Sequence, residues 1–260
     1  MKNAEIDSPT REMLLEYLLR LADDRLILGQ RLSEWCGHGP FLEEDLALAN
    51  FALDLIGQAN FLLEEAAALE GKERTADELA FFREAEEFRN LNLVEQPNGD
   101  FGDTIARQFL FDAYSYFLME GLSDSKYSGL AAIAAKTVKE DRYHLRHSRE
   151  WVLRLGDGTE ESRQRIQASF DNLWTFSGEI FEVDDVDQFL SERGFAVDLK
   201  NIRPKWTEVV NQTLIEATLT VPDSAQYMQR GGRKGLHTEH LGHLLSKMQV
   251  LPRSYPDAKW

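Results

Sequence analysis

The sequence predicts an all-α fold, a helical bundle with additional C-terminal helices. Apolar residues recur at spacings of three and four along nearly the whole chain, which is the period of one face of a helix. The sequence contains no convincing pair of strands and no internal repeat of about 20–50 residues. We therefore expect one domain over residues 1–260, with a core bundle at about 9–155 and bracing helices at about 159–260.

Residues that start or stop helices bound the long helices of the expected bundle. The first helix begins at Ser8-Pro9, which suits an N-cap followed by a first helical position, and glycines at 37 and 39 end it. Thr75 and Glu78 have the spacing of a capping box that opens a shorter helix. Asp103 is the expected cap of the third long helix. The other long helices are predicted at about 43–70, 103–121 and 125–155, and the later ones at about 159–177, 184–193, 204–219 and 238–250.

Composition limits the partners and the compartment. The net charge is −16, so a nucleic-acid partner is not expected. The single cysteine, Cys36, excludes an internal disulfide framework and a zinc site built from several cysteines. The N-terminal segment lacks the basic and apolar regions of a secretion signal, and no stretch approaches about 18 uninterrupted apolar residues. We expect a cytoplasmic protein that binds neither membranes nor nucleic acids.

Carboxylates near the middle of three predicted long helices indicate a polar inner face. Asp54, Asp112 and Asp141 occupy these positions, and His144 follows Asp141 by three residues on the same helix face. Di-iron carboxylate bundles combine two acid-x-x-His pairs with two further acids, all pointing inward. The second pair is incomplete here, because Gly57 stands where a histidine should follow Asp54. Spacing alone favours an inner face held by ion pairs and hydrogen bonds over a working metal site.

An active di-iron carboxylate oxygenase is the alternative interpretation. It would need a further ligand to replace the missing histidine, and the first helix offers only Asp24 or Glu34 as ambiguous candidates. Its ligands would be Asp54, Asp112, Asp141 and His144.

The segment HTEHLGH at 237–243 gathers three of the six histidines, but its spacing does not predict a zinc site. Histidines at i, i+3 and i+6 diverge around a helix, and the H-E-x-x-H pattern is absent. Thr238 suits an N-cap, which leaves His237 outside the helix. We interpret the preceding QRGGRKGL as a flexible linker that leads to a docking helix.

Four segments in one order resemble a known family. They are LEEDLALANFALDLIGQA, NLVEQPNGDFGDTIARQ, KEDRYHLRHSREWVLRLGDGTEES and GGRKGLHTEHLGHLLSKMQ. They resemble the C subunits of the bacterial ring 1,2-phenylacetyl-CoA epoxidases, which are multicomponent monooxygenases of phenylacetate degradation. The resemblance covers the chain from about Leu14 to Trp260.

This resemblance implies a ferritin-like helical subunit that pairs with and stabilises a catalytic A subunit. The A subunit would hold the di-iron centre, a small B subunit would join the assembly, and a flavin and iron–sulfur reductase would bring electrons from NADPH. For this chain the resemblance implies no catalytic residue, metal or cofactor of its own. A homodimer of the chain alone is left open. The remnant metal-site positions would be Asp54, Gly57, Asp112, Asp141 and His144. A C-terminal docking segment would include His237, Glu239 and His240.

Overall fold

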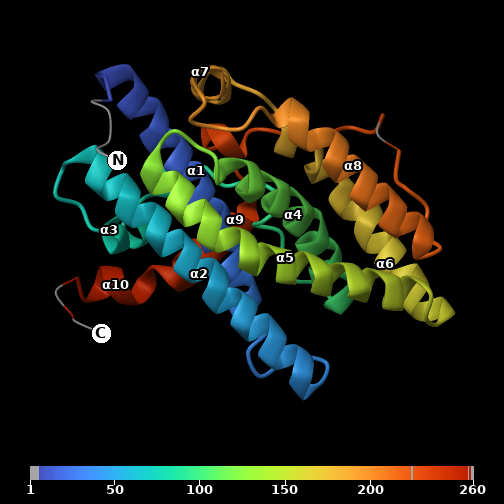
Figure 1. Cartoon of the computed structure of the whole chain (residues 1–260). Coiled ribbons are helices and arrows are strands. Elements are labelled where there is room, and N and C mark those ends of the chain that lie inside the picture. The colour runs from blue at the N-terminus through green and yellow to red at the C-terminus, as the bar shows by residue number, and fades with distance from the viewer. Residues whose placement is uncertain (1–5, 224, 257, 259–260) are drawn as a thin grey trace. The chain divides into compact units, whose positions relative to one another are not determined.

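The computed structural model describes residues 6–223, 225–256 and 258, which form helices joined by turns and irregular segments (Figure 1). These residues contain ten α-helices and no strand, which confirms the predicted all-α class. The chain divides into two compact units: a central unit, Asn98–Arg230, and a terminal unit formed by Ile6–Pro97 and Gly231–Trp260. The single domain expected over 1–260 stays a prediction, and its ends at 1–5 and 259–260 lie outside the described residues.

In the terminal unit, α1 and α2 lie side by side and carry most of the apolar core (Figure 1). Gly29 permits their close approach, because a Cβ atom there would lie 2.9 Å from Cγ1 of Ile56. Gly71 ends α2 in the left-handed conformation, with φ +70°, as glycine does at many helix C-termini. The α-helices of this unit are α1 (Ser8–Ser33), α2 (Leu42–Glu70), α3 (Ala76–Phe81), α9 (Glu239–Met248) and α10 (Val250–Ser254).

Two consecutive buried aspartates of α1 fix irregular segments of the terminal unit. Arg83 donates to Asp23 from Nη1 to Oδ2 at 3.0 Å, and Arg233 donates to Asp24 from Nη2 to Oδ2 at 2.8 Å. The backbone N–H of Leu91 also donates to Asp24, at 2.8 Å. A buried carboxylate needs such partners, because an uncompensated charge in the interior is strongly destabilising. The aspartates therefore hold chain segments far apart in sequence against one helix.

In the central unit, α4 contacts α5, α6 and α8 and carries much of the core. Phe109 of α4 meets Phe170 edge to face, with ring centroids 6.3 Å apart. The indole N–H of Trp206 donates to the Leu110 carbonyl at 2.9 Å, which ties α8 to α4. The α-helices of this unit are α4 (Phe101–Leu122), α5 (Ser128–Gly156), α6 (Glu160–Leu173), α7 (Asp185–Arg193) and α8 (Leu199–Glu216).

Two helices of the central unit begin earlier in the sequence than predicted. The N-cap of α4 is Asp100; Asp103 is the other half of a reciprocal capping box, in which each aspartate side chain accepts the other's backbone N–H. The helix predicted from 204 begins at Leu199, because Asp198 caps it by accepting the Lys200 N–H at 2.9 Å. Pro204 therefore lies inside α8 and not at its start.

Candidate functional site

Three of the predicted inner-face residues come together in the central unit. Asp112 lies on α4, and Asp141 and His144 lie one turn apart on the same face of α5. All three side chains are buried. Asp112 interacts electrostatically with both Asp141 and His144. The structure thus places these residues in one buried polar cluster, which we call the α4–α5 cluster.

Hydroxyl and amide donors hold the two carboxylates of this cluster. Ser148 Oγ donates to Asp112 Oδ2 at 2.8 Å, and Gln108 Nε2 donates to Asp112 Oδ1 at 2.6 Å. Ser115 Oγ donates to Asp141 Oδ2 at 2.6 Å. The residue spacing in the sequence favoured an inner face held by ion pairs and hydrogen bonds over a metal site. The hydrogen bonds to these two buried carboxylates are of that kind.

The metal-ligand pattern does not include the three donors of the cluster, although their spacing in the sequence could have identified them. Gln108 and Ser115 lie four residues before and three residues after Asp112, and Ser148 lies four residues after His144. Residues three and four apart are neighbours on a helix face. A search of the inner face for any polar side chain, and not only for metal ligands, would have included them.

Burial governs the protonation of Asp112. Burial raises the pKa of this carboxyl to about 7, and the charge of Asp141 adds to the effect. The charge of His144 and the hydrogen bonds from Ser148 and Gln108 oppose it and keep the pKa from rising further. The carboxyl of Asp112 therefore gains or loses its proton near neutral pH. A metal site would hold a metal cation between such carboxylates, whereas this cluster can hold a proton.

The remaining members of the expected ligand set lie in the terminal unit. Asp54 and Gly57 lie on α2 in the terminal unit and are half-buried. A Cβ atom at Gly57 would meet nothing within 4 Å, so glycine there is not required by packing. Of the α1 candidates, Asp24 is bound by Arg233, and Glu34 is exposed and paired with Arg31 at 3.2 Å.

A di-iron centre therefore does not fit the donor set. In residues 6–223, 225–256 and 258, no group of three or more His, Cys, Asp or Glu side chains could hold a metal ion. The position that would carry the second histidine has no side chain, and the two carboxylates of the α4–α5 cluster already accept hydrogen bonds. The alternative of an active di-iron oxygenase is left without support.

The C-terminal histidines belong to a different arrangement. His237 precedes α9, and its Nδ1 lies 2.9 Å from Glu95 Oε2 while its Nε2 lies 3.0 Å from the Phe88 carbonyl oxygen. Thr238 is the N-cap residue of α9, and its backbone N–H and hydroxyl donate to Glu95 Oε1 at 2.6 and 2.7 Å. These contacts attach the start of α9 to the segment before Pro97.

The other residues of this segment do not converge on His237. His240 is half-buried, and Glu239 and His243 are exposed. The glycine-rich loop before the segment is not the flexible linker that we expected. Arg233 anchors it, since this side chain binds Asp24 and also donates to the Arg89 carbonyl at 2.7 Å. A docking role of His237, Glu239 and His240 toward another chain stays a prediction.

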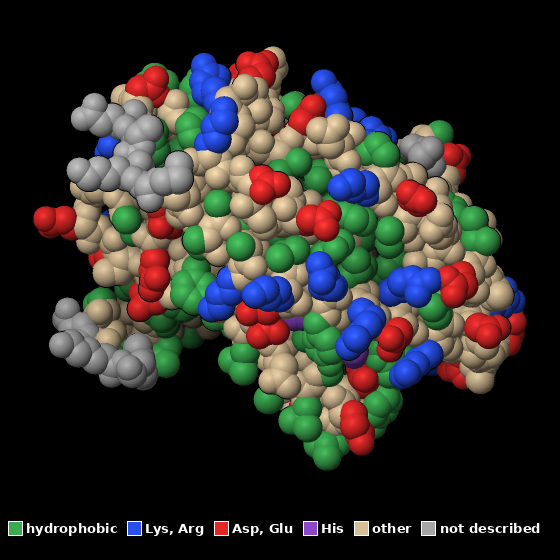
Figure 2. All heavy atoms as spheres, in the orientation of Figure 1, with side chains coloured by type: hydrophobic (Ala, Val, Ile, Leu, Met, Phe, Trp, Pro, Cys, Tyr) green, Lys and Arg blue, Asp and Glu red, His purple; other side chains and the backbone are tan. Residues whose placement is uncertain are grey.

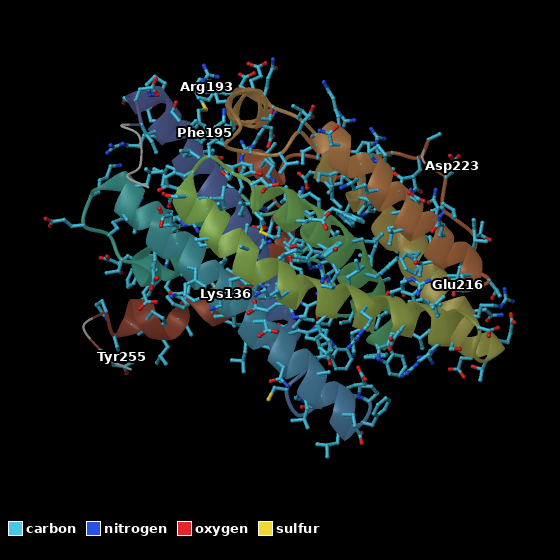
Figure 3. The ribbon with its side chains drawn as sticks, viewed as in Figure 1. Lys136, Arg193, Phe195, Glu216, Asp223 and Tyr255 are labelled. Atoms are coloured by element: carbon cyan, nitrogen blue, oxygen red, sulfur yellow. The ribbon has the colours of Figure 1, made fainter. Side chains whose placement is uncertain are left out.

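Two surface features, one in each unit, lie outside the α4–α5 cluster. On α5 an exposed row of cations crosses the view of Figure 2, and Figure 3 labels its first member. Two of these arginines stack on tyrosines, with guanidinium carbon to ring centroid distances of 5.7 and 5.2 Å. On α2, three leucines with a common helix face are exposed, by 70, 54 and 68%. The cations are Lys136, Lys139, Arg142, Arg146 and Arg154. The leucines are Leu42, Leu46 and Leu53.

The fold defines the class of protein: an all-α, ferritin-like helical protein, which here has a buried cluster of two carboxylates and a histidine. The chain belongs to the family described as phenylacetic acid catabolic protein, which matches it over residues 1–260. This confirms the family resemblance of the four segments. A curated relative is the C subunit of the 1,2-phenylacetyl-CoA epoxidase of Escherichia coli (strain K12). It is 53% identical over 247 residues, which cover 95% of this chain and 99% of the relative.

Among the described helices, α2 alone has the length and apolar composition that could cross a membrane. This is weak evidence, because the core helix of a soluble protein passes the same test, and 44% of the most apolar window of α2 is buried.

Proposed function

We propose that this chain is a structural subunit of a phenylacetyl-CoA 1,2-epoxidase in phenylacetate catabolism. In this role it pairs with the catalytic A subunit and stabilises it, while A holds the di-iron centre and this chain holds no metal or cofactor. The small B subunit joins the same cytoplasmic assembly, and the flavin and iron–sulfur reductase acts on it through A. The curated relative, whose name makes it a subunit of this epoxidase, supports the proposal.

The α4–α5 cluster is the observation that carries the non-catalytic part of the proposal. Asp112 and Asp141 accept hydrogen bonds from Ser148, Gln108 and Ser115. Such bonds satisfy buried carboxylates without a cation and keep the two helices in register. A rigid subunit of this kind can pack against a catalytic partner and support the helices that carry the partner's metal ligands.

The exposed leucines of α2 support a role in assembly. Soluble monomers rarely leave large contiguous apolar patches open, and such patches mark interaction sites. Leu42, Leu46 and Leu53 recur at four and seven residues, so one helix face presents them together. The proposal assigns this face to the A subunit, because aliphatic side chains of this kind fill the core of a lasting interface.

The double substitution Leu46→Gln/Leu53→Gln tests this proposal. Both side chains are exposed in the isolated chain, so folding should not change. Capture of the chain by tagged A subunit on co-expression should fall by about tenfold or more, because each leucine buried in an interface contributes about 1.5–3 kcal/mol.

The matched control is Ile215→Gln, which replaces an equally exposed aliphatic side chain on α8. Its capture should equal that of the unchanged chain. If the unchanged chain is not captured at all, the proposed pairing is wrong. If the control loses capture as strongly as the double variant, the pairing holds but the assignment of the α2 face is wrong.

A further inference from the structure

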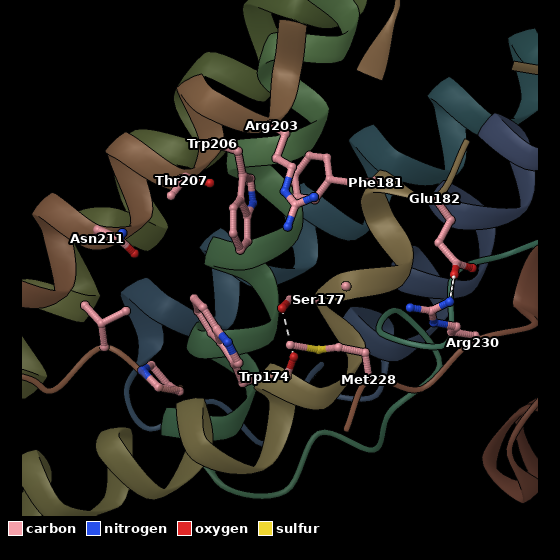
Figure 4. Close-up of a pocket in the computed structure, with 13 residues that line it drawn as sticks. Trp174, Ser177, Phe181, Glu182, Arg203, Trp206, Thr207, Asn211, Met228 and Arg230 are labelled. Atoms are coloured by element: carbon pink, nitrogen blue, oxygen red, sulfur yellow. Dashed lines mark hydrogen bonds and ion pairs between the residues drawn. The ribbon is translucent and has the colours of Figure 1, made fainter. Parts of the chain in front are cut away.

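The central unit contains a cavity that plays no part in the α4–α5 cluster. Its volume is about 640 Å³, and it lies between α8, the short 3-10 helices after α6 and the irregular segment near Met228 (Figure 4). Cavities of about 300–1,000 Å³ are typical of sites for small organic ligands. The size alone therefore allows a ligand with one or two rings.

Aromatic side chains form its apolar walls. The ring centroids of Trp174 and Trp206 are 5.8 Å apart, and those of Phe181 and Trp206 are 5.2 Å apart with a tilt of 66°. The hydrogen bond from Trp206 to the Leu110 carbonyl fixes the central ring of this group. Rigid aromatic walls favour a flat apolar ligand, because stacked and edge-to-face contacts stabilise aromatic pairs.

The wall that carries Met228 is also fixed. The Gln229 N–H donates to the Thr175 carbonyl at 2.7 Å, and the Thr175 hydroxyl donates to the Tyr227 carbonyl at 2.8 Å. Gly178 lets this segment approach closely, since a Cβ atom there would lie 2.7 Å from Cγ of Met228. The cavity is thus bounded by packed and hydrogen-bonded elements of one unit.

Its polar groups include donors with no acceptor. Arg203 stacks on Phe181, with 5.9 Å from the guanidinium carbon to the ring centroid, and forms no ion pair with any described carboxylate. The indole N–H of Trp174 is buried and lacks an acceptor among the described residues. The other arginine of the cavity, Arg230, is already paired with Glu182 at 2.9 Å. The guanidinium of Arg203 is exposed, so an oxygen acceptor on a ligand can reach it in place of water.

We propose that this cavity binds a small aromatic carboxylate. The ring lies against Trp174, Trp206 and Phe181, and the carboxylate accepts hydrogen bonds from Arg203. A pure hydrocarbon would make no hydrogen bond with Arg203. A nucleotide or another multiply charged phosphate is disfavoured, because the described lining of the cavity offers a single free arginine beside the carboxylate of Glu182. The proposal does not rest on the assembly role of the chain.

The test uses the full chain and 2-naphthylacetate, an aromatic carboxylate, in isothermal titration calorimetry. We expect saturable binding at one site per chain. Arg203→Gln should weaken it by about tenfold, since hydrogen bonds to charged groups contribute more than neutral ones. Trp174→Phe keeps an aromatic wall and removes the N–H, so it should weaken binding by a smaller factor. The neutral 2-naphthylacetamide should bind the unchanged chain about tenfold more weakly, and Arg203→Gln should weaken its binding less than that of the carboxylate.

Arg142→Gln is the matched control, because Arg142 also stacks on an aromatic ring, that of Tyr116, but lines no part of this cavity. It should leave affinity unchanged. The proposal is overturned if the unchanged chain shows no saturable binding. It is also overturned if Arg142→Gln and Arg203→Gln weaken binding equally, or if the amide binds as tightly as the carboxylate.

Discussion

Replacing Arg233 with methionine is expected to lower the free energy of unfolding by about 3–5 kcal/mol, the cost of leaving a buried charge without its partner. Arg233 holds both carboxylate oxygens of Asp24, at 3.0 and 2.8 Å, and the side chain of Asp24 is fully buried. Burial raises the pKa of Asp24, and the charge and hydrogen bonds of Arg233 oppose this rise. Without the arginine, Asp24 must remain as a charge in the interior or take up a proton.

The measurement is urea unfolding at pH 5 and pH 8. The loss should be smaller at pH 5, because the pKa of Asp24 rises further in the variant and the protonated carboxyl needs no counter-charge. Asp24→Asn in the Arg233→Met background should recover most of the loss. Arg230→Met is the control, because its ion pair with Glu182 is exposed and such pairs contribute at most about 1 kcal/mol. Equal losses from both arginine variants would contradict the role of the buried pair.

Asp112→Asn is expected to remove a pH dependence from the stability of the chain. Because burial raises the pKa of Asp112 to about 7, the folded state binds more protons than the unfolded state between about pH 4 and pH 7. The contribution of this group is therefore fully present below about pH 4 and is lost as the pH rises through 7. At about 1.4 kcal/mol for each pKa unit, the loss is at most about 4 kcal/mol.

Asparagine has the same shape and no charge, so the variant should gain stability relative to the unchanged chain between pH 5 and pH 8. Ser148 can accept from the new amide, because its hydroxyl has a second acceptor in the Leu145 carbonyl at 3.4 Å. Urea unfolding at both pH values gives the difference. Asp124→Asn, at an exposed aspartate, should show no such change with pH. A variant less stable at pH 8 than the unchanged chain would show that the ionised carboxylate is stabilising.

Helix boundaries were predicted well where a single capping or terminating residue in the sequence sets the boundary. The second helix was expected at 43–70 and spans Leu42–Glu70, because Gly71 adopts the left-handed conformation that ends it. Ser125 was expected to begin the fourth long helix, but its hydroxyl donates to the Phe195 carbonyl at 2.7 Å, and α5 starts at Ser128. That contact joins residues 70 apart, so no local pattern contains it.

The candidate site could likewise be predicted only where its residues lie close together in the sequence. The spacing of Asp141 and His144 placed both on one face of α5, and the helical period placed Asp112 on the inner face of α4. The pairing of Arg233 with Asp24 joins residues 209 apart and could not be read from spacing. The loop that contains Arg233 therefore looked like a flexible linker, because its glycines are visible in the sequence and its anchor is not.

Metal content per chain is the most direct test of the proposed structural role. The chain should be expressed alone in iron-rich medium, purified without chelators and analysed by plasma mass spectrometry. We expect iron and zinc far below one atom per chain, because hydrogen-bond donors satisfy Asp112 and Asp141 and Gly57 contributes no ligand. Iron approaching two atoms per chain, lost on replacement of His144 or Asp141, would contradict the proposed role and would make these residues metal ligands.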